Sequence, residues 1–92
     1  MPQVTKQLLI KGAVQGVGFR YSMVAMAGQK GITGWVRNRR DGSVEAVVQG
    51  DERSVKAAVE WAKRGPDIAV VDTVEISDAT GDFSEFSIRE TA

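Results

Sequence analysis

Gln15-Gly16-Val17-Gly18-Phe19-Arg20 is the stretch that decides the fold of this chain, and we call it the glycine loop. Before it, the apolar and β-branched run from Lys6 to Val14 predicts a strand. After it, from Tyr21, small and apolar residues recur at helical spacing. The glycine loop is therefore a predicted strand-to-helix turn, in which Gly12, Gly16 and Gly18 leave the backbone free to bend tightly and to approach a ligand.

The predicted helix start makes the glycine loop a candidate anion site. A helix that begins near Tyr21 leaves its first backbone N–H groups without partners inside the helix, and they point back at the loop. With the positive end of the helix dipole they favour an anion. Arg20 adds a permanent charge whose planar fork of donors fits phosphate oxygens. The sequence thus predicts a cradle for a phosphate or sulfate anion; the alternative is a glycine-rich turn with a solvated arginine.

Composition limits the possible chemistry. The 92 residues fit one domain, 1–92, with 42% hydrophobic and 26% charged residues, as is typical of globular proteins. The chain has no cysteine, which excludes disulfides and thiolate metal sites. It also has no histidine, which removes the commonest general base and metal ligand and every Ser/His or Cys/His nucleophile pair. An enzyme with this sequence works without imidazole or thiolate.

The charges are distributed unevenly along the chain. Residues 1–40 carry seven basic residues and no acid, whereas the remainder carries five basic residues and all twelve acids. This asymmetry indicates an N-terminal part that meets an anion; the alternative is a solvated mixed surface. A net charge of zero argues against broad binding of polyanions. Neither a long apolar run nor a signal-like segment after residues 1–6 is present, so we expect a cytoplasmic protein without a membrane partner.

The rest of the chain alternates between strand and helix patterns. Asp41-Gly42 is a hairpin-turn signal, Asp51 is a good N-cap residue, and Gly31 is a plausible helix stop. We expect strands over 4–14, 33–38, 43–50, 69–76 and 83–89, and helices over 21–30 and 51–64. The buried stripe of the first helix is predicted to be Tyr21, Val24, Ala25 and Gly28, broadened by Met23, Met26 and Ala27; that of the second is Val55, Ala58, Val59 and Ala62.

This order, βαββαβ plus a terminal strand, predicts the fold class. Two helices packed on one face of a mainly antiparallel sheet bury these apolar faces most economically. We therefore expect an α+β, ferredoxin-like split-βαβ sandwich. The fold alone does not indicate a function, because it carries many.

Three look-alikes of the glycine loop can be excluded. A P-loop needs Gly-Lys-Ser/Thr where Gly18-Phe19-Arg20 stands, and a dinucleotide fingerprint needs a small residue where Tyr21 stands. An RNA-recognition domain shares this topology, but its stacking aromatics belong on the third strand. The predicted third strand, 43–50, has no aromatic residue, so we expect no nucleic-acid partner.

A second sequence motif follows the glycine loop along the chain. The chain carries Gly12-x-Val14-Gln15-Gly16-Val17-x-Phe19-Arg20, then Gly34-Trp35-Val36-Arg37-Asn38-x-x-x-Gly42-x-Val44, closing on Gly50. In both stretches, and over nearly its full length, it closely resembles the acylphosphatase family.

This resemblance implies an activity and the residues that carry it. It implies a small ferredoxin-like enzyme, a monomer without metal or organic cofactor, that hydrolyses acyl phosphates to a carboxylate and inorganic phosphate. By resemblance, Arg20 binds the phosphate and Asn38 holds the attacking water. The backbone N–H groups of the glycine loop bind the substrate; these belong to Gln15, Gly16, Val17, Gly18 and Phe19.

Some roles stay open at this point. Asn38 can instead shape the turn before Asp41-Gly42. Trp35 is expected in packing, and Arg37, Arg39 and Arg40 either form a solvated rim or steer an anionic substrate. A competing function is a non-catalytic anion-binding module on the same fold. A third is a domain of a larger assembly, as in maturation factors acting on carbamoyl phosphate, which the short chain disfavours.

Overall fold

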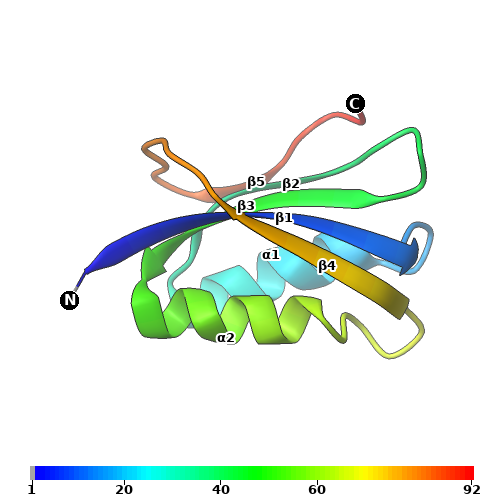
Figure 1. The fold of residues 1–92 in the computed structure, drawn as a ribbon, viewed down its shortest axis with the longest axis horizontal. Helices are drawn as coiled ribbons and strands as arrows, with labels where there is room; N and C mark the ends of the chain where they lie inside the picture. Colours follow the sequence, from blue (N-terminus) through cyan, green and yellow to red (C-terminus); the bar gives the residue numbers. More distant parts are fainter. Residues whose placement is uncertain (1) are drawn as a thin grey trace.

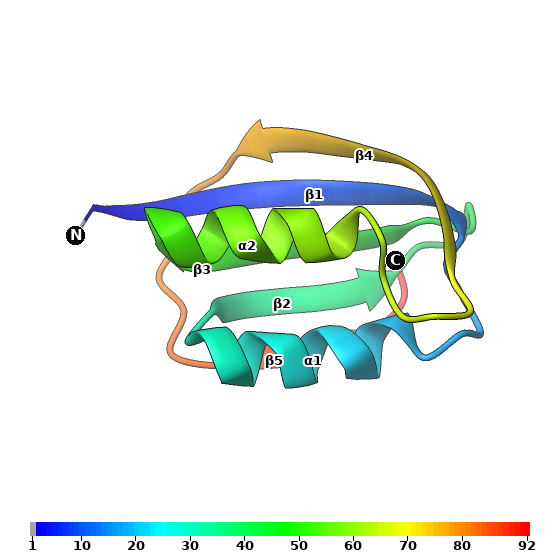
Figure 2. The same ribbon diagram turned by 90° about the horizontal axis from the view of Figure 1, so that it is seen from below.

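Five strands form one sheet, and both helices lie on one of its faces (Figures 1 and 2). This is a computed structural model that describes residues 2–92. The strand order is β4-β1-β3-β2-β5; β2 and β5 are parallel and the other pairs antiparallel. The elements are β1 (Gln3–Ala13), α1 (Phe19–Lys30), β2 (Thr33–Asn38), β3 (Val44–Asp51), α2 (Glu52–Ala62), β4 (Val70–Asp78) and β5 (Phe86–Ile88). The predicted ferredoxin-like class is confirmed.

The core lies between the sheet and the helices. Leu8 and Ile10 of β1 face Ala46 and Val44 of β3 in the antiparallel register, and all four side chains are fully buried. The predicted stripe of α2 is confirmed, because its buried residues are Val55, Ala58, Val59 and Ala62.

The predicted stripe of α1 is wrong. Tyr21 is 72% exposed, and Ala25 and Gly28 are also exposed. The buried residues of α1 are Phe19 together with Met23, Met26 and Ala27, the three residues predicted to broaden the stripe. Phe19 and the two methionines bury more apolar surface than Ala25 and Gly28 could, and they set the orientation of the helix.

Two helix boundaries also differ from the prediction. Helix α1 begins at Phe19, two residues before Tyr21, because Gly18 adopts a left-handed conformation as its N-cap. Helix α2 ends at Ala62, and its last turn holds no basic residue, since Lys63 and Arg64 follow it. The predicted stop of α1 is confirmed: Gly31 has a φ of 69° and donates its N–H to the carbonyl of Ala27.

Buried side chains also lie on the face of the sheet that points away from the helices. Val47 and Trp35 oppose each other across β3 and β2 and are both buried, and the ring of Trp35 is flanked by the guanidinium groups of Arg37 and Arg89. Gln49 is buried there as well, and its side chain bonds the β4–β5 connection through the carbonyl of Gly81 at 2.6 Å. Trp35 is thus a packing residue, as expected. Within residues 2–92, no helix has both the length and the apolar character needed to cross a bilayer.

Candidate active site

The glycine loop joins the end of β1 to the start of α1 and has the backbone of an anion-binding nest. Gly16 has a φ of 74° and Gly18 a φ of 76°, while Val17 between them has a negative φ. Such alternation turns successive N–H groups toward one concave side. A Cβ atom at Gly16 or Gly18 would meet nothing within 4 Å, so these positions require glycine for their backbone conformation.

Apolar side chains anchor the glycine loop to the core. Val14 and Phe19 are buried, and Val17 packs against the same core. The ring of Phe19 meets that of Trp61 edge-on, with 5.4 Å between the centroids. A Cβ atom at Gly65 would lie 2.5 Å from the Phe19 ring, so the segment after α2 closes over it. The side chain of Phe19 is therefore buried, which leaves its backbone groups for a ligand, whereas Val17 is half-buried.

The N-terminus of α1 is left uncapped. Gly18 has no side chain to cap it, and the first turn contains no acidic residue. The first bond of the helix runs from the N–H of Ser22 to the carbonyl of Gly18 at 3.0 Å. In the part of the chain that the structure describes, the N–H groups of Phe19, Arg20 and Tyr21 consequently have no partner. No acidic side chain of this first turn and no capping side chain among residues 2–92 neutralises the positive end of the helix dipole.

Arg20 differs from the other half-buried basic residues. Lys6 pairs with Asp78, and Arg37 and Arg39 pair with Glu45. Arg20 is half-buried too, yet within residues 2–92 it forms neither an ion pair nor a side-chain hydrogen bond. A half-buried guanidinium beside unpaired N–H groups is suited to an external anion.

Asn38 is the last residue of β2, half-buried and paired with Val44 of β3. Its side-chain amide bonds no other group among the described residues. Asp41 shapes the turn instead, since its Oδ1 accepts from the backbone N–H of Ser43 at 2.9 Å and from its hydroxyl at 2.6 Å. These bonds lower the pKa of Asp41. The turn-shaping role considered for Asn38 thus belongs to Asp41, and the amide of Asn38 is available to a ligand.

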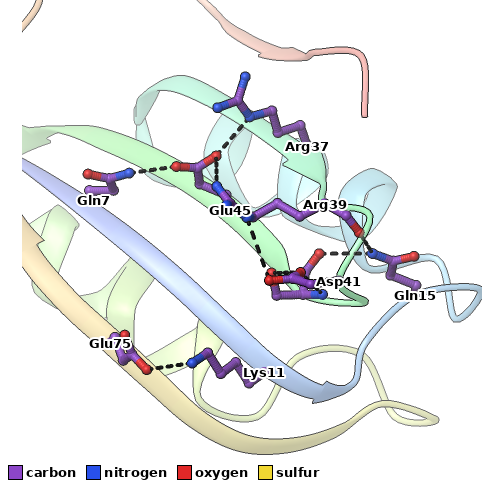
Figure 3. A network of polar contacts seen from close by, with 9 residues as sticks. Gln7, Lys11, Gln15, Arg37, Arg39, Asp41, Glu45 and Glu75 are labelled. Atoms are coloured by element: carbon purple, nitrogen blue, oxygen red, sulfur yellow. Dashed lines mark hydrogen bonds and ion pairs between the residues drawn. The ribbon is translucent and has the colours of Figure 1, made fainter. Parts of the chain in front are cut away.

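The side chain of Gln15 links the two parts of the site, which the sequence did not indicate (Figure 3). Its Nε2 donates to the carbonyl of Arg39 at 2.7 Å and to that of Ser43 at 2.9 Å. Both carbonyls belong to the turn (residues 39–43) that follows Asn38, which we call the hairpin turn. Gln15, expected to act through its backbone, thus also has a side chain engaged with the hairpin turn.

A buried acid holds two of the three arginines of this region (Figure 3). Glu45 is 5% exposed, and its Oε1 accepts from Arg37 Nε at 2.8 Å and Arg39 Nη1 at 3.3 Å. Its Oε2 accepts from Gln7 at 2.6 Å. Burial raises the pKa of Glu45, but these bonds and the two positive charges outweigh it and leave the pKa below its ordinary value. Arg37 and Arg39 are therefore internal ion-pair partners, and of the three arginines Arg40 is the exposed one.

A metal site is not formed by the side chains that the structure describes: within residues 2–92, no three acidic groups come together as ligands.

Comparison with known proteins gives a consistent result. The acylphosphatase family model matches residues 6–88. An acylphosphatase of Albidiferax ferrireducens is 56% identical, over 99% of each chain. An acylphosphatase of Thiobacillus denitrificans is 54% identical, over 92% of this chain and 96% of that relative. The solved structure of an acylphosphatase from Coxiella burnetii superposes with a TM-score of 0.91 at 35% identity, covering 95% of this chain and 93% of that one. The chain belongs to the acylphosphatase family, whose members are hydrolases of acyl phosphate anhydrides.

Proposed function

We propose that the glycine loop and Arg20 bind the phosphoryl group of an acyl phosphate, and that Asn38 orients the attacking water. The observation that carries this proposal is the pairing of an uncapped helix N-terminus with a half-buried arginine that lacks a partner among the described residues. The backbone N–H groups of residues 15–19 are the proposed substrate donors. Their fixed positions stabilise negative charge on the phosphoryl oxygens without reorganisation.

The reaction makes few demands on the protein. The oxygen of water forms a bond to phosphorus, the bond from phosphorus to the acyl oxygen breaks, and the carboxylate leaves with the bonding electron pair. A proton of the water passes to a phosphoryl oxygen. Because a carboxylate departs readily, positioning and charge stabilisation are the main tasks, as in phosphoryl transfer generally. A chain without histidine can perform both.

Asn38 fits the role of a water-orienting residue. Its amide offers a carbonyl oxygen that accepts from water and an NH2 group that donates. Such a group holds a nucleophile in place but does not deprotonate it. Its position at the strand end beside the hairpin turn, which Gln15 ties to the glycine loop, supports this role.

The test is hydrolysis of benzoyl phosphate in EDTA by the wild type and by Asn38→Ala. We expect turnover by the wild type, and a kcat about 10² to 10³ lower in the variant, the range seen when one positioned polar group is removed. The inhibition constant of inorganic phosphate should change much less, because Arg20 and the N–H groups remain. A pure loss of phosphate binding would reassign Asn38.

Absence of wild-type turnover, with phosphate still raising the thermal midpoint, would instead make the protein a binding module. The proposed enzyme acts as a cytoplasmic monomer, and light scattering coupled to size exclusion tests the oligomeric state. A pH–rate profile adds a check on the proton transfer. A steep limb near neutral pH, typical of a histidine, would contradict transfer to the substrate.

A further inference from the structure

The side chain of Gln15 joins two segments that the sheet leaves apart. The ladder between β1 and β3 ends at the pair Ile10–Val44, five residues before Gln15. Within residues 2–92, the direct hydrogen bonds between the segments 14–18 and 39–43 are the two that Gln15 Nε2 donates, at 2.7 and 2.9 Å. This one amide therefore supplies the direct hydrogen bonds that hold the glycine loop against the hairpin turn.

The geometry of the contact matches an amide group. Nε2 carries two hydrogens, and each is directed to a different carbonyl. Each carbonyl also accepts one bond inside the hairpin turn: Ser43 O from Arg39 N–H at 2.8 Å, and Arg39 O from Gly42 N–H at 3.1 Å. Both lone pairs of each oxygen are thus used. The backbone hydrogen bonds of the hairpin turn itself stay in place, and Gln15 adds its two bonds to them without replacing either.

The hairpin turn is the direct continuation of the strand end that carries Asn38. Asn38 precedes Arg39 in sequence, and its partner Val44 follows Ser43. We propose that Gln15 is a positioning residue, whose side-chain amide holds the bound phosphoryl group in register with the water on Asn38. This inference rests on the proposed function of the glycine loop and Asn38.

The proposal predicts an effect on turnover that exceeds the effect on binding. Gln15→Met keeps a similar length but has no N–H donor, while the hairpin turn keeps its own bonds and Arg20 remains. We expect kcat for benzoyl phosphate to fall about ten- to hundredfold, as small misplacements of reacting groups do. The inhibition constant of inorganic phosphate should change less than about threefold.

Gln7→Met is the matched control. Gln7 lies on β1, and its Nε2 makes a partly buried bond to Glu45 at 2.6 Å, away from the glycine loop. Its loss should lower the thermal midpoint to an extent similar to that in Gln15→Met but leave kcat within about twofold of the wild type. A purely structural role of Gln15 predicts the same kcat for the two variants.

A second readout uses the wild type and does not depend on any variant folding. In a ¹⁵N–¹H spectrum both side-chain amide protons of Gln15 should exchange slowly with solvent, because both are bonded. Fast exchange would overturn the proposal. So would a kcat of Gln15→Met equal to that of Gln7→Met, or equal losses of kcat and of phosphate affinity in Gln15→Met. If the wild type shows no turnover, the proposed function fails. The exchange rates of these protons still test separately whether Gln15 bonds the hairpin turn.

Discussion

Helix α2 begins directly after β3 and is capped by Asp51, whose Oδ1 accepts from the backbone N–H of Ser54 at 2.8 Å. Glu52 adds a negative charge to its first turn. Helix α1 begins after the connection 14–18 with Gly18 as its N-cap, and it has neither a capping side chain nor an acid. The two helices occupy equivalent places in the two βαβ halves of the fold. The N-terminus of α2 is neutralised by groups of the chain itself, whereas that of α1 has no such group among residues 2–92 and is the proposed ligand site.

The second residue of each helix sharpens this contrast. Arg20 is the second residue of α1 and Arg53 the second residue of α2. An arginine is unfavourable near the positive end of a helix dipole. At α2 the acid groups of Asp51 and Glu52 offset it, and Arg53 is exposed. At α1 no acidic group among residues 2–92 pairs with the half-buried Arg20, and under the proposed function the phosphoryl group of the substrate offsets its charge. This difference between the two helix starts is what the proposed phosphate site at α1 would explain.

The largest effect on activity is expected when Arg20 is replaced by alanine, and the same replacement of Arg53 serves as its control. Arg20→Ala should lower kcat/KM for benzoyl phosphate by about 10³ or more, the range for an arginine that stabilises a transferring phosphoryl group. Arg53→Ala should leave it within about twofold. Circular dichroism checks that both variants keep the fold. Equal losses in the two variants would show that general charge, and not the α1 site, attracts the substrate.

A smaller effect is expected when α1 is given an acidic N-cap like that of α2. In Gly18→Asp the added carboxylate competes for the free N–H groups and repels phosphate, so the inhibition constant of inorganic phosphate should rise at least about tenfold. Gly18→Ala is the control, because it shares the strain of a side chain at a φ of 76° but adds no charge. If alanine and aspartate weaken phosphate binding equally, the loop conformation alone is responsible.

The reverse change, Asp51→Ala, should affect stability and not activity. It removes the bond to the Ser54 N–H and leaves the N-terminus of α2 uncapped. We expect the thermal midpoint to fall by about a few degrees for a domain of this size. Hydrolysis of benzoyl phosphate below that midpoint should be unchanged. A large loss of kcat would mean that the two helix starts are coupled.

Much of the contrast between the helices can be predicted from local sequence. Asp51 has the right residue type for an N-cap, and Gly31 for a helix stop, and both predictions are confirmed. The run of glycines before Arg20 likewise predicts a bend before a helix. These features depend on neighbours within a few residues, which a single sequence shows.

The parts that sequence reasoning missed depend on contacts between distant residues. Gln15 bonds carbonyls 24 and 28 residues away, and backbone carbonyls leave no residue-type signal. Glu45 alternates with apolar residues as a solvent-facing residue would, yet Arg37, Arg39 and Gln7 enclose it. The orientation of α1 was mispredicted because small residues at helical spacing suggest a buried stripe on either of two faces. Tertiary packing decides between them.

The smallest expected effect concerns pH. The backbone hydrogen bond from Ser54, with that from its hydroxyl, lowers the pKa of Asp51 below its ordinary value of 3.8. Because the pKa of Asp51 is lower in the folded protein, its ionised carboxylate stabilises the fold fully at a pH well above 3.8. This stabilisation is lost as the pH falls through the pKa of the folded state. Asp51→Asn keeps a good cap without the charge. The difference in thermal midpoint between the wild type and this variant should therefore shrink as the pH falls below 3.8. A difference that is constant with pH would contradict the role of the charge.

The most direct test of the central claim is a phosphate titration of the ¹⁵N-labelled wild type, followed through the backbone amide resonances. We predict saturable shifts at the five proposed donors and at the proposed phosphate-binding arginine, which are Gln15, Gly16, Val17, Gly18, Phe19 and Arg20. The first turn of α2 should be unaffected, although it is also a helix N-terminus that bears an arginine. Shifts spread over Arg53, Lys56 and Arg64, or equal at both helix starts, would contradict it.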